Sequence, residues 1–463
     1  MQYIENKTFD EISVGDSASL VRTLRQQDIE LFAVMSGDVN PAHVDVEYAK
    51  ADIFHEVIAH GMWGGALISA VLGTELPGPG TIYLNQSLSF RRPVGLGDTV
   101  TVTVTAKEKQ DEKKRVIFTC ECLNGDGEKV IVGEAEVIAP TVKVRRPRVT
   151  LPEVHLHERG ASYQKLLDAC AKLDPIRVAV VHPCDVVSLN GALEAMSMGL
   201  IIPILIGPRD KIDAVALEAQ ASLEGIERID VPHSHAAAQS AVALVREGKA
   251  QSIMKGKLHT DELMNAIVDK KKGLRTERRM SHVFAMDVPH YPKPLMITDA
   301  AINIYPELLD KRDIIQNAID MAHALGMSLP KVAILSAVET VTPAIRSTID
   351  AAALCMMANR GQISGGILDG PLAFDNAISR AAADAKGIVS QVAGDADILV
   401  APDLEAGNMI AKQLIYLSGA DAAGIVLGAR VPIILTSRAD GVLARLVSCA
   451  LAQLFTHHHV VRV

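Results

Sequence analysis

The sequence predicts a multidomain protein in which an α+β domain precedes an α/β domain. The length of 463 residues is enough for two to four domains. Residues 99–138 alternate apolar and polar side chains with period two, as antiparallel strands do. After residue 159, short apolar runs alternate with alanine-rich stretches, as in β-α units around a parallel sheet. Between them, residues 146–158 combine prolines and basic side chains without a sustained period, so we expect domains at 1–145 and 159–463 joined by a basic linker.

The composition excludes several classes of protein. Hydrophobic residues make up 49% of the chain and charged residues 22%, which is typical of packed domains rather than disordered chains. Aromatic residues are only 3%, so the cores must consist mainly of Ala, Val, Ile and Leu, and few side chains are present on which single-stranded nucleic acid could stack. The net charge of −9 argues against binding to nucleic acid or to acidic membranes, but it leaves room for local basic pockets.

The amino terminus and the cysteines indicate a reducing compartment. The first residues, MQYIENKTFDE, are polar and acidic, unlike a secretory signal. The six cysteines include one C-x-C pair but no C-x-x-C pair. We therefore expect reduced, mostly buried thiols, no metal site and a cytoplasmic protein.

The strands of the first domain include a recognisable hairpin. Val100 and Val102 alternate with threonines and predict a half-buried strand. The sequence Asn-Gly-Asp-Gly at 124–127 predicts the turn between two further alternating runs. Cys120 and Cys122 fall on one face of such a strand, which favours packing in the core over redox chemistry.

A helix precedes the densest group of functional residue types. Thr23 and Gln26 predict a capping box at its start. Gly37 can end this helix, and Pro41 prevents its continuation. We therefore expect a tight turn in the segment SGDVNPAHVD, at positions 36–45.

Asp38 and His43 lie in that turn, near enough to act on one water molecule or proton. The alternative from these residues alone is a turn-capping aspartate and a hydrogen-bonded histidine. A second segment, IAHGMW at 58–63, opens an apolar helix that we expect to be buried on most sides. Glycine at its start lets a ligand approach the backbone, and the free N–H groups there can polarise a thioester carbonyl.

The segments GDVNPAHVD, IAHGM, YLNQSLSF and RPV before Gly-Asp resemble the MaoC-like (R)-specific enoyl-CoA hydratase family over nearly all of residues 8–140. The resemblance implies a hot-dog fold, an antiparallel sheet around one long helix, that works as a dimer. It implies that Asp38 accepts a proton from water while His43 supplies the proton that reaches the α-carbon. It further implies that the Gly61 N–H holds the thioester oxygen and that Ser69 orients the site, without a metal or redox cofactor.

Two other histidines of the first domain have different expected roles. His60 either lines the site or is a structural histidine at a helix start, and the sequence leaves both open. His55 is expected to be structural.

The second domain contains one anion site with a physical rationale, Thr436–Asp440. A Ser-Arg pair between a strand and a helix offers N–H groups, a hydroxyl and a guanidinium to one phosphate. A structural Arg–carboxylate pair with an aspartate cap is the alternative. Acidic segments at 369–376, 395–397 and 402–408 also follow or flank predicted strands, where ligands of α/β sheets gather, although each acidic residue can equally be a helix cap.

The segments ISGGILDGPLAFDNAIS, VAGDADILVAPDLEAGN, GIVLGARVPIILTSRAD, IMKGKLHT and GLRTERRMSHV resemble the phosphate acetyl/butyryltransferase family over about 165–455. The resemblance implies a two-subdomain α/β/α fold of the isocitrate/isopropylmalate dehydrogenase-like type. Subdomain one would comprise about 159–303 plus 435–463, and subdomain two about 304–434. The implied reaction is reversible acyl transfer between CoA and inorganic phosphate, in which the CoA thiolate attacks the carbonyl carbon of an acyl phosphate.

The second resemblance also carries residues over. Ser437 and Arg438 match the Ser-Arg pair of the family. The remaining expected substrate contacts are Lys255, Arg275, Asn408 and Asp440.

Two departures from the acetyl-specific pattern accompany these matches. Ala444 stands where acetyl-specific members have a candidate aspartate base, for which Asp440 could substitute. Asn265 stands where those members have an arginine, which Arg275 could replace.

The combined expectation is a bifunctional enzyme with CoA thioesters, inorganic phosphate and acyl phosphate as substrates, no bound cofactor, and homo-oligomers through both domains. One alternative is a phosphate acyltransferase whose hot-dog domain serves for dimerisation or acyl-CoA binding. Another keeps the hydratase and makes the second domain a degenerate scaffold, because of Ala444 and Asn265.

Overall fold

The computed structural model describes residues 3–150, 154, 161–435 and 441–461. The chain divides into two compact units, Met1–His157 and Glu158–Val463. Within the described residues, no helix is both long and apolar enough to cross a bilayer.

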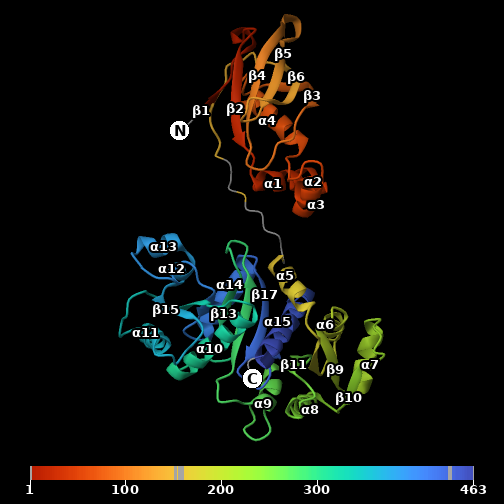
Figure 1. The fold of residues 1–463 in the computed structure, drawn as a ribbon, viewed down its shortest axis with the longest axis vertical. Coiled ribbons are helices and arrows are strands. Elements are labelled where there is room, and N and C mark those ends of the chain that lie inside the picture. The colour runs from red at the N-terminus through yellow and green to blue at the C-terminus, as the bar shows by residue number, and fades with distance from the viewer. Residues whose placement is uncertain (1–2, 151–153, 155–160, 436–440, 462–463) are drawn as a thin grey trace. The chain divides into compact units, whose positions relative to one another are not determined.

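An antiparallel sheet packed around one helix forms the first unit (Figure 1). Among its described residues, five strands pair in the order β2-β4-β5-β6-β3, and every pair is antiparallel. Helix α4 turns Trp63, Ile68 and Leu72 into the core against these strands. This confirms the expected hot-dog fold. The elements are β1 (Tyr3–Glu5), a 3-10 turn (Phe9–Glu11), β2 (Ser17–Thr23), α1 (Gln26–Ser36), α2 (Pro41–Val44), α3 (Val46–Ala51), α4 (Gly61–Thr74), β3 (Ile82–Phe90), β4 (Thr99–Gln110), a second 3-10 turn (Asp111–Lys113), β5 (Arg115–Leu123), β6 (Lys129–Ile138) and β7 (Arg145–Pro147).

The predicted hairpin joins β5 and β6. Asn124 N–H donates to the Glu128 carbonyl at 3.0 Å, and Gly127 adopts a φ of 79°, a conformation that favours glycine. Cys120 and Cys122 are fully buried on one face of β5. Burial raises the pKa of the Cys120 thiol to about 11 and that of Cys122 to about 12, so both stay protonated and pack in the core as predicted.

A short ladder closes the first unit just before the predicted linker. β7 pairs antiparallel with β1, with Tyr3 opposite Pro147 and Glu5 opposite Arg145. A hydrogen-bonded strand therefore occupies the first two residues of the segment 146–158. The ladder joins residues far apart in sequence, which the local composition of the segment does not reveal.

One continuous sheet runs through the described part of the second unit. Eleven strands pair there in the order β10-β9-β8-β11-β18-β17-β12-β13-β16-β14-β15. The first five are mutually parallel, and so are the last four. The three contacts between β18 and β13 are antiparallel, so the two parallel groups run in opposite directions. The prediction of a parallel sheet is wrong at this centre, because a short hairpin connects β12 to β13 and cannot make the crossover that parallel strands need.

Small aliphatic side chains fill the core of this unit, as the aromatic-poor composition predicted. β11 and β13 are buried at every position, and α15 lies against β17 (Figure 1). The strands are β8 (Ile176–Val181), β9 (Ile201–Gly207), β10 (Glu227–Asp230), β11 (Ser252–Lys255), β12 (Ser281–Asp287), β13 (Leu295–Thr298), β14 (Lys331–Leu335), β15 (Ile367–Leu372), β16 (Ile398–Val400), β17 (Asp421–Leu427) and β18 (Ile433–Ile434). The helices are α5 (Ala161–Cys170), α6 (Val186–Ser197), α7 (Arg209–Glu218), α8 (Ser234–Arg246), α9 (Thr260–Val268), α10 (Leu308–Ala324), α11 (Arg346–Asn359), α12 (Phe374–Ile378), α13 (Arg380–Ala385), α14 (Leu404–Leu417) and α15 (Val442–Val461).

Candidate functional site

Helix α1 ends where the sequence predicted but begins with a different cap. Gly37 ends the helix in the left-handed conformation, with a φ of 74°. The predicted capping box of Thr23 and Gln26 is wrong, since Thr23 ends strand β2. Arg25 is the N-cap instead, and its N–H donates to the Asp28 carboxylate at 3.0 Å. A carboxylate at this position also interacts favourably with the helix dipole.

The turn after α1 brings Asp38 and His43 together as predicted. Asn40 caps the short helix α2, its side chain accepting from Ala42 N–H at 3.2 Å, and Pro41 is the first helical residue. Asp38 is exposed, and its carboxylate accepts from Asn40 N–H at 3.2 Å. The carboxylate therefore remains open to solvent.

His60 joins this pair from the N-terminus of α4. Its Nε2–H donates to the Asp38 carbonyl at 3.0 Å, and its ring centroid lies 4.0 Å from that of His43. One carboxylate oxygen of Asp38 and one ring nitrogen each of His43 and His60 lie within 4.8 Å of one another. They are close enough to share a water molecule, a proton or a metal ion. The sequence left the role of His60 open, because its contact with Asp38 spans 22 residues and no local pattern predicts it.

Hydrogen bonds to backbone carbonyls determine which nitrogen of each histidine is free. Carbonyl oxygens only accept, so His43 must carry a proton on Nδ1, which donates to the Ile58 carbonyl at 2.9 Å. His43 Nε2 is then the nitrogen that exchanges protons. His60 is 2% exposed and likewise donates from Nε2, and its buried Nδ1 has no hydrogen-bond partner among the described residues.

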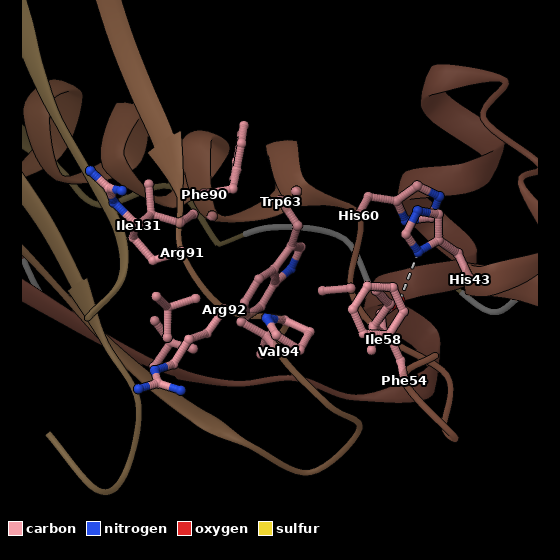
Figure 2. A pocket seen from close by; sticks show the side chains of 16 residues that line it. His43, Phe54, Ile58, His60, Trp63, Phe90, Arg91, Arg92, Val94 and Ile131 are labelled. Carbon is pink, nitrogen blue, oxygen red and sulfur yellow. Dashed lines mark hydrogen bonds between the residues drawn. The ribbon is translucent and has the colours of Figure 1, made fainter. Parts of the chain in front are cut away.

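An apolar cavity of about 300 Å³ opens beside the two histidines (Figure 2). Trp63, Val94 and Ile131 line its interior, and Gly61 lines it at the start of α4. A side chain at Gly61 would press against the Phe90 ring, with a Cβ contact of 3.1 Å. Glycine at this position therefore leaves the Phe90 ring in place, and the helix terminus next to it directs its first N–H groups outward.

Ser69 and His55 lie outside this arrangement. Ser69 is exposed two turns along α4 from Gly61, about 12 Å of helix rise, and the cavity lining does not include it. Its expected orienting role stays a prediction. His55 is exposed, with Nδ1 3.3 Å from the Lys50 carbonyl, and is likewise absent from the lining.

In the second unit, Ser437, Arg438 and Asp440 lie outside the described residues. Lys255 is 9% exposed at the carboxyl end of β11. β11 pairs in parallel with β18, with Met254 opposite Ile434, so Lys255 lies beside the carboxyl end of β18. Its expected contact with phosphate stays a prediction.

Arg275 and Asn408 are not brought to that strand end. Arg275 is exposed and pairs with Ala429, just beyond the carboxyl end of β17. Because β17 is antiparallel to β18, Arg275 lies towards the amino end of β18. Asn408 lies in α14, and its amide donates to the Ala300 carbonyl at 3.0 Å, after β13. Their expected substrate contacts stay predictions.

The acidic segments of the second unit have different structural roles. Asp403 caps α14, its carboxylate accepting from Ala406 N–H. Asp375 is not a cap, because it lies within the first turn of α12. Asp395 and Asp397 both pair with Lys293, at 2.8 and 2.6 Å, so they belong to a partly buried ion network.

The two departures from the family pattern occupy helices. Ala444 is in the first turn of α15, and its carbonyl accepts from the Ser448 hydroxyl at 2.9 Å. Asn265 lies on α9, in a groove shared with His235 and Glu262. Neither residue offers a carboxylate or guanidinium to replace the missing groups.

Comparison with known proteins assigns both units. The sequence profile of the phosphate acetyl/butaryl transferase family matches residues 233–452, and that of the MaoC like domain matches 13–122. A phosphate acetyltransferase of Rhizobium meliloti is 62% identical over 295 residues, which make up 64% of this chain and 93% of that protein. The chain belongs to the phosphate acetyl/butyryltransferase family. In this family member a MaoC-like domain precedes the transferase domain.

A solved structure supports the fold of the second unit. A branched-chain phosphotransacylase of Enterococcus faecalis covers 61% of this chain and 100% of its own, with 30% identity and a TM-score of 0.54. This confirms the expected phosphotransacylase fold of the transferase domain. An unliganded R-hydratase of Pseudomonas aeruginosa is 44% identical and covers 34% of this chain and 99% of its own, with a TM-score of 0.33.

Proposed function

We propose that the chain is a bifunctional CoA-thioester enzyme. The MaoC-like domain hydrates short-chain enoyl-CoA with R stereochemistry, and the transferase domain moves an acyl group reversibly between CoA and inorganic phosphate. The observation that carries the first activity is the cluster of Asp38, His43 and His60, in which both histidines line an apolar cavity at the start of α4. An acyl-binding module would need the cavity but not an exposed carboxylate beside a free imidazole nitrogen.

Hydration at this site needs two proton transfers on one face of the double bond. The Asp38 carboxylate takes a proton from water, and the oxygen of that water bonds to the β-carbon of the enoyl thioester. His43, protonated on Nε2, gives a proton to the α-carbon, while the Gly61 N–H stabilises the charge that develops on the thioester oxygen. The bond from His43 Nδ1–H to Ile58 supports this role, because it orients Nε2 as the exchanging nitrogen.

The second activity is supported by the relatives of the transferase domain. The relative from Rhizobium meliloti that is 62% identical is called a phosphate acetyltransferase, which favours acetyl as the acyl group. In the proposed reaction the CoA thiolate attacks the carbonyl carbon of acetyl phosphate, and inorganic phosphate leaves. Arg438, Ser437 and Lys255 would hold the phosphate by charge-assisted hydrogen bonds.

Two assays on the intact chain test the proposal. Hydration of crotonyl-CoA reports the first domain, and phosphate-dependent conversion of acetyl-CoA to acetyl phosphate reports the second. Both should proceed. Transfer without hydration would support a transferase that carries a binding module, and hydration without transfer would support a degenerate second domain.

We also propose a homo-oligomer through the MaoC-like domain. Met62, Ala66 and Ser69 form an exposed stripe along α4, and Ile82 and Tyr83 are exposed on the edge strand β3. An exposed apolar edge strand is a site where another chain can pair. Sedimentation of the intact protein should show at least dimers, and a monomer would contradict the proposal.

A further inference from the structure

The cavity of the MaoC-like domain contains the single tryptophan of the chain, Trp63. Trp63 lies in the first turn of α4 and is 7% exposed. Its N–H donates to the His60 carbonyl at 2.9 Å, so the start of the helix fixes its backbone relative to the histidines. A buried indole at this point occupies volume that a ligand would otherwise fill.

The indole lies between the two ends of the cavity. Figure 2 shows His43 and His60 on one side of Trp63 and Ile131 on the other. The other side is lined by Ile131 and the adjacent Val130, which are buried core residues of β6. An acyl chain that starts at the histidines must therefore pass the indole before it reaches this apolar end.

We propose that Trp63 restricts the hydratase site to short acyl chains by separating the histidines from the end formed by Val130 and Ile131. This inference rests on the proposed hydratase function and names its substrate class. Replacing the indole by a smaller side chain would connect the two ends. Each methylene that then enters apolar surroundings is worth about fourfold in binding.

Fluorescence of the wild-type protein tests the contact without a substitution and without turnover. Because Trp63 is the only tryptophan, the emission reports this cavity alone. Butyryl-CoA is saturated and cannot be hydrated, so it serves as the probe. It should shift or quench the emission, whereas free CoA and octanoyl-CoA at the same concentration should not. Unchanged emission with butyryl-CoA, or the same change with free CoA, would overturn the proposal.

Chain-length selectivity tests the consequence. In Trp63→Leu, the ratio of kcat/KM for 2-octenoyl-CoA to that for crotonyl-CoA should rise at least about tenfold. Phe118→Leu is the matched control, since Phe118 is a fully buried aromatic of β5 outside the cavity lining, and its ratio should stay at the wild-type value. An unchanged ratio in folded Trp63→Leu would overturn the proposal.

Two further measurements distinguish failure of the Trp63 proposal from misfolding of the variant and from absence of hydratase activity. If Trp63→Leu does not fold, Trp63→Phe removes less volume and should raise the same ratio by a smaller factor, while no rise would count against the proposal. If the wild-type protein hydrates neither substrate, the proposed hydratase function fails. The butyryl-CoA titration then still decides whether Trp63 contacts a short acyl chain.

Discussion

The two domains build their sites in different ways. In the MaoC-like domain, Asp38, His43 and His60 come from one stretch of 23 residues, and a helix end, a short helix and a helix start bring them together. In the transferase domain, the expected contacts come from segments spread over the sequence: Lys255 lies at the end of β11, Arg275 beside the end of β17, and Asn408 in α14. The proximity of residues within one local segment can be predicted from the sequence. The proximity of residues from distant segments depends on the order and direction of the strands between them, which the sequence does not show locally.

The largest expected effect follows from the local site. Asp38→Asn and His43→Ala should each lower crotonyl-CoA hydration by about 10³-fold, because each removes one of the two groups that transfer protons. Phosphate-dependent acetyl transfer by the same protein should be unchanged, and it serves as the control for folding. Near-normal hydration in both variants would show that the cluster is not the site.

Local sequence patterns also predicted the fold of the first domain better than that of the second. The alternation of Val100 and Val102 and the turn at 124–127 were enough to predict the antiparallel sheet of the first domain, because period and turn type are local properties. The antiparallel centre of the second sheet was missed, since nothing local distinguishes a buried antiparallel strand such as β12 from a buried parallel one.

Site residues show the same limit. The proximity of Asp38 and His43 was predicted because glycine and proline define their turn. The contact of His60 with Asp38 was not predicted, and neither was the position of Arg275 towards the amino end of β18, which follows from the direction of β17. The start of α1 at Arg25, with Asp28 accepting from its N–H, was missed because Thr23 and Gln26 match the spacing of a capping box.

In the transferase domain, replacing Arg438 should weaken the binding of phosphate more than it slows acyl transfer. Arg438→Ala should raise the Michaelis constant for phosphate or acetyl phosphate by roughly 10- to 100-fold, because a charge-assisted hydrogen bond to an anion is lost. Arg360→Ala, at an exposed arginine that ends α11, is the matched control and should leave that constant unchanged. An unchanged constant in Arg438→Ala would remove Arg438 from the phosphate site.

A smaller effect is expected from the hydrogen bond between His60 and the Asp38 carbonyl, which joins residues 22 positions apart in the sequence. His60→Phe keeps an aromatic ring beside His43 but removes the donor to the Asp38 carbonyl, so kcat for hydration should fall about tenfold with little change in KM. His60→Gln keeps a donor and should recover part of the loss. Equal kcat values for wild type and His60→Phe would show that the hydrogen bond does not position Asp38.

The smallest expected effect is a loss of stability at low pH in the transferase domain but not in the MaoC-like domain. Burial lowers the pKa of His282 to about 4, against 6.5 for an exposed histidine, and the nearby Asp299 only partly opposes the shift. The unfolded chain therefore takes up this proton first as the pH falls. The stabilisation is complete above about pH 6.5 and is lost as the pH falls towards 4, by roughly 1–3 kcal/mol.

Thermal inactivation between pH 7 and pH 5 measures this difference. The transferase activity of the wild type should be lost at progressively lower temperature as the pH falls, and His282→Gln should show a shallower dependence. Hydratase activity is the internal control, because His282 lies in the other domain and its substitution should not alter the pH dependence of the hydratase. Identical slopes for transferase activity in both proteins would contradict the assignment to His282.

The central claim is that one chain carries a working hydratase in addition to the transferase of its family. The most direct test is to give the intact protein crotonyl-CoA and to determine the configuration of the 3-hydroxybutyryl-CoA formed. The account predicts hydration with the R product alone. No hydration by a protein that still converts acetyl-CoA and phosphate to acetyl phosphate would contradict it, and so would formation of the S product.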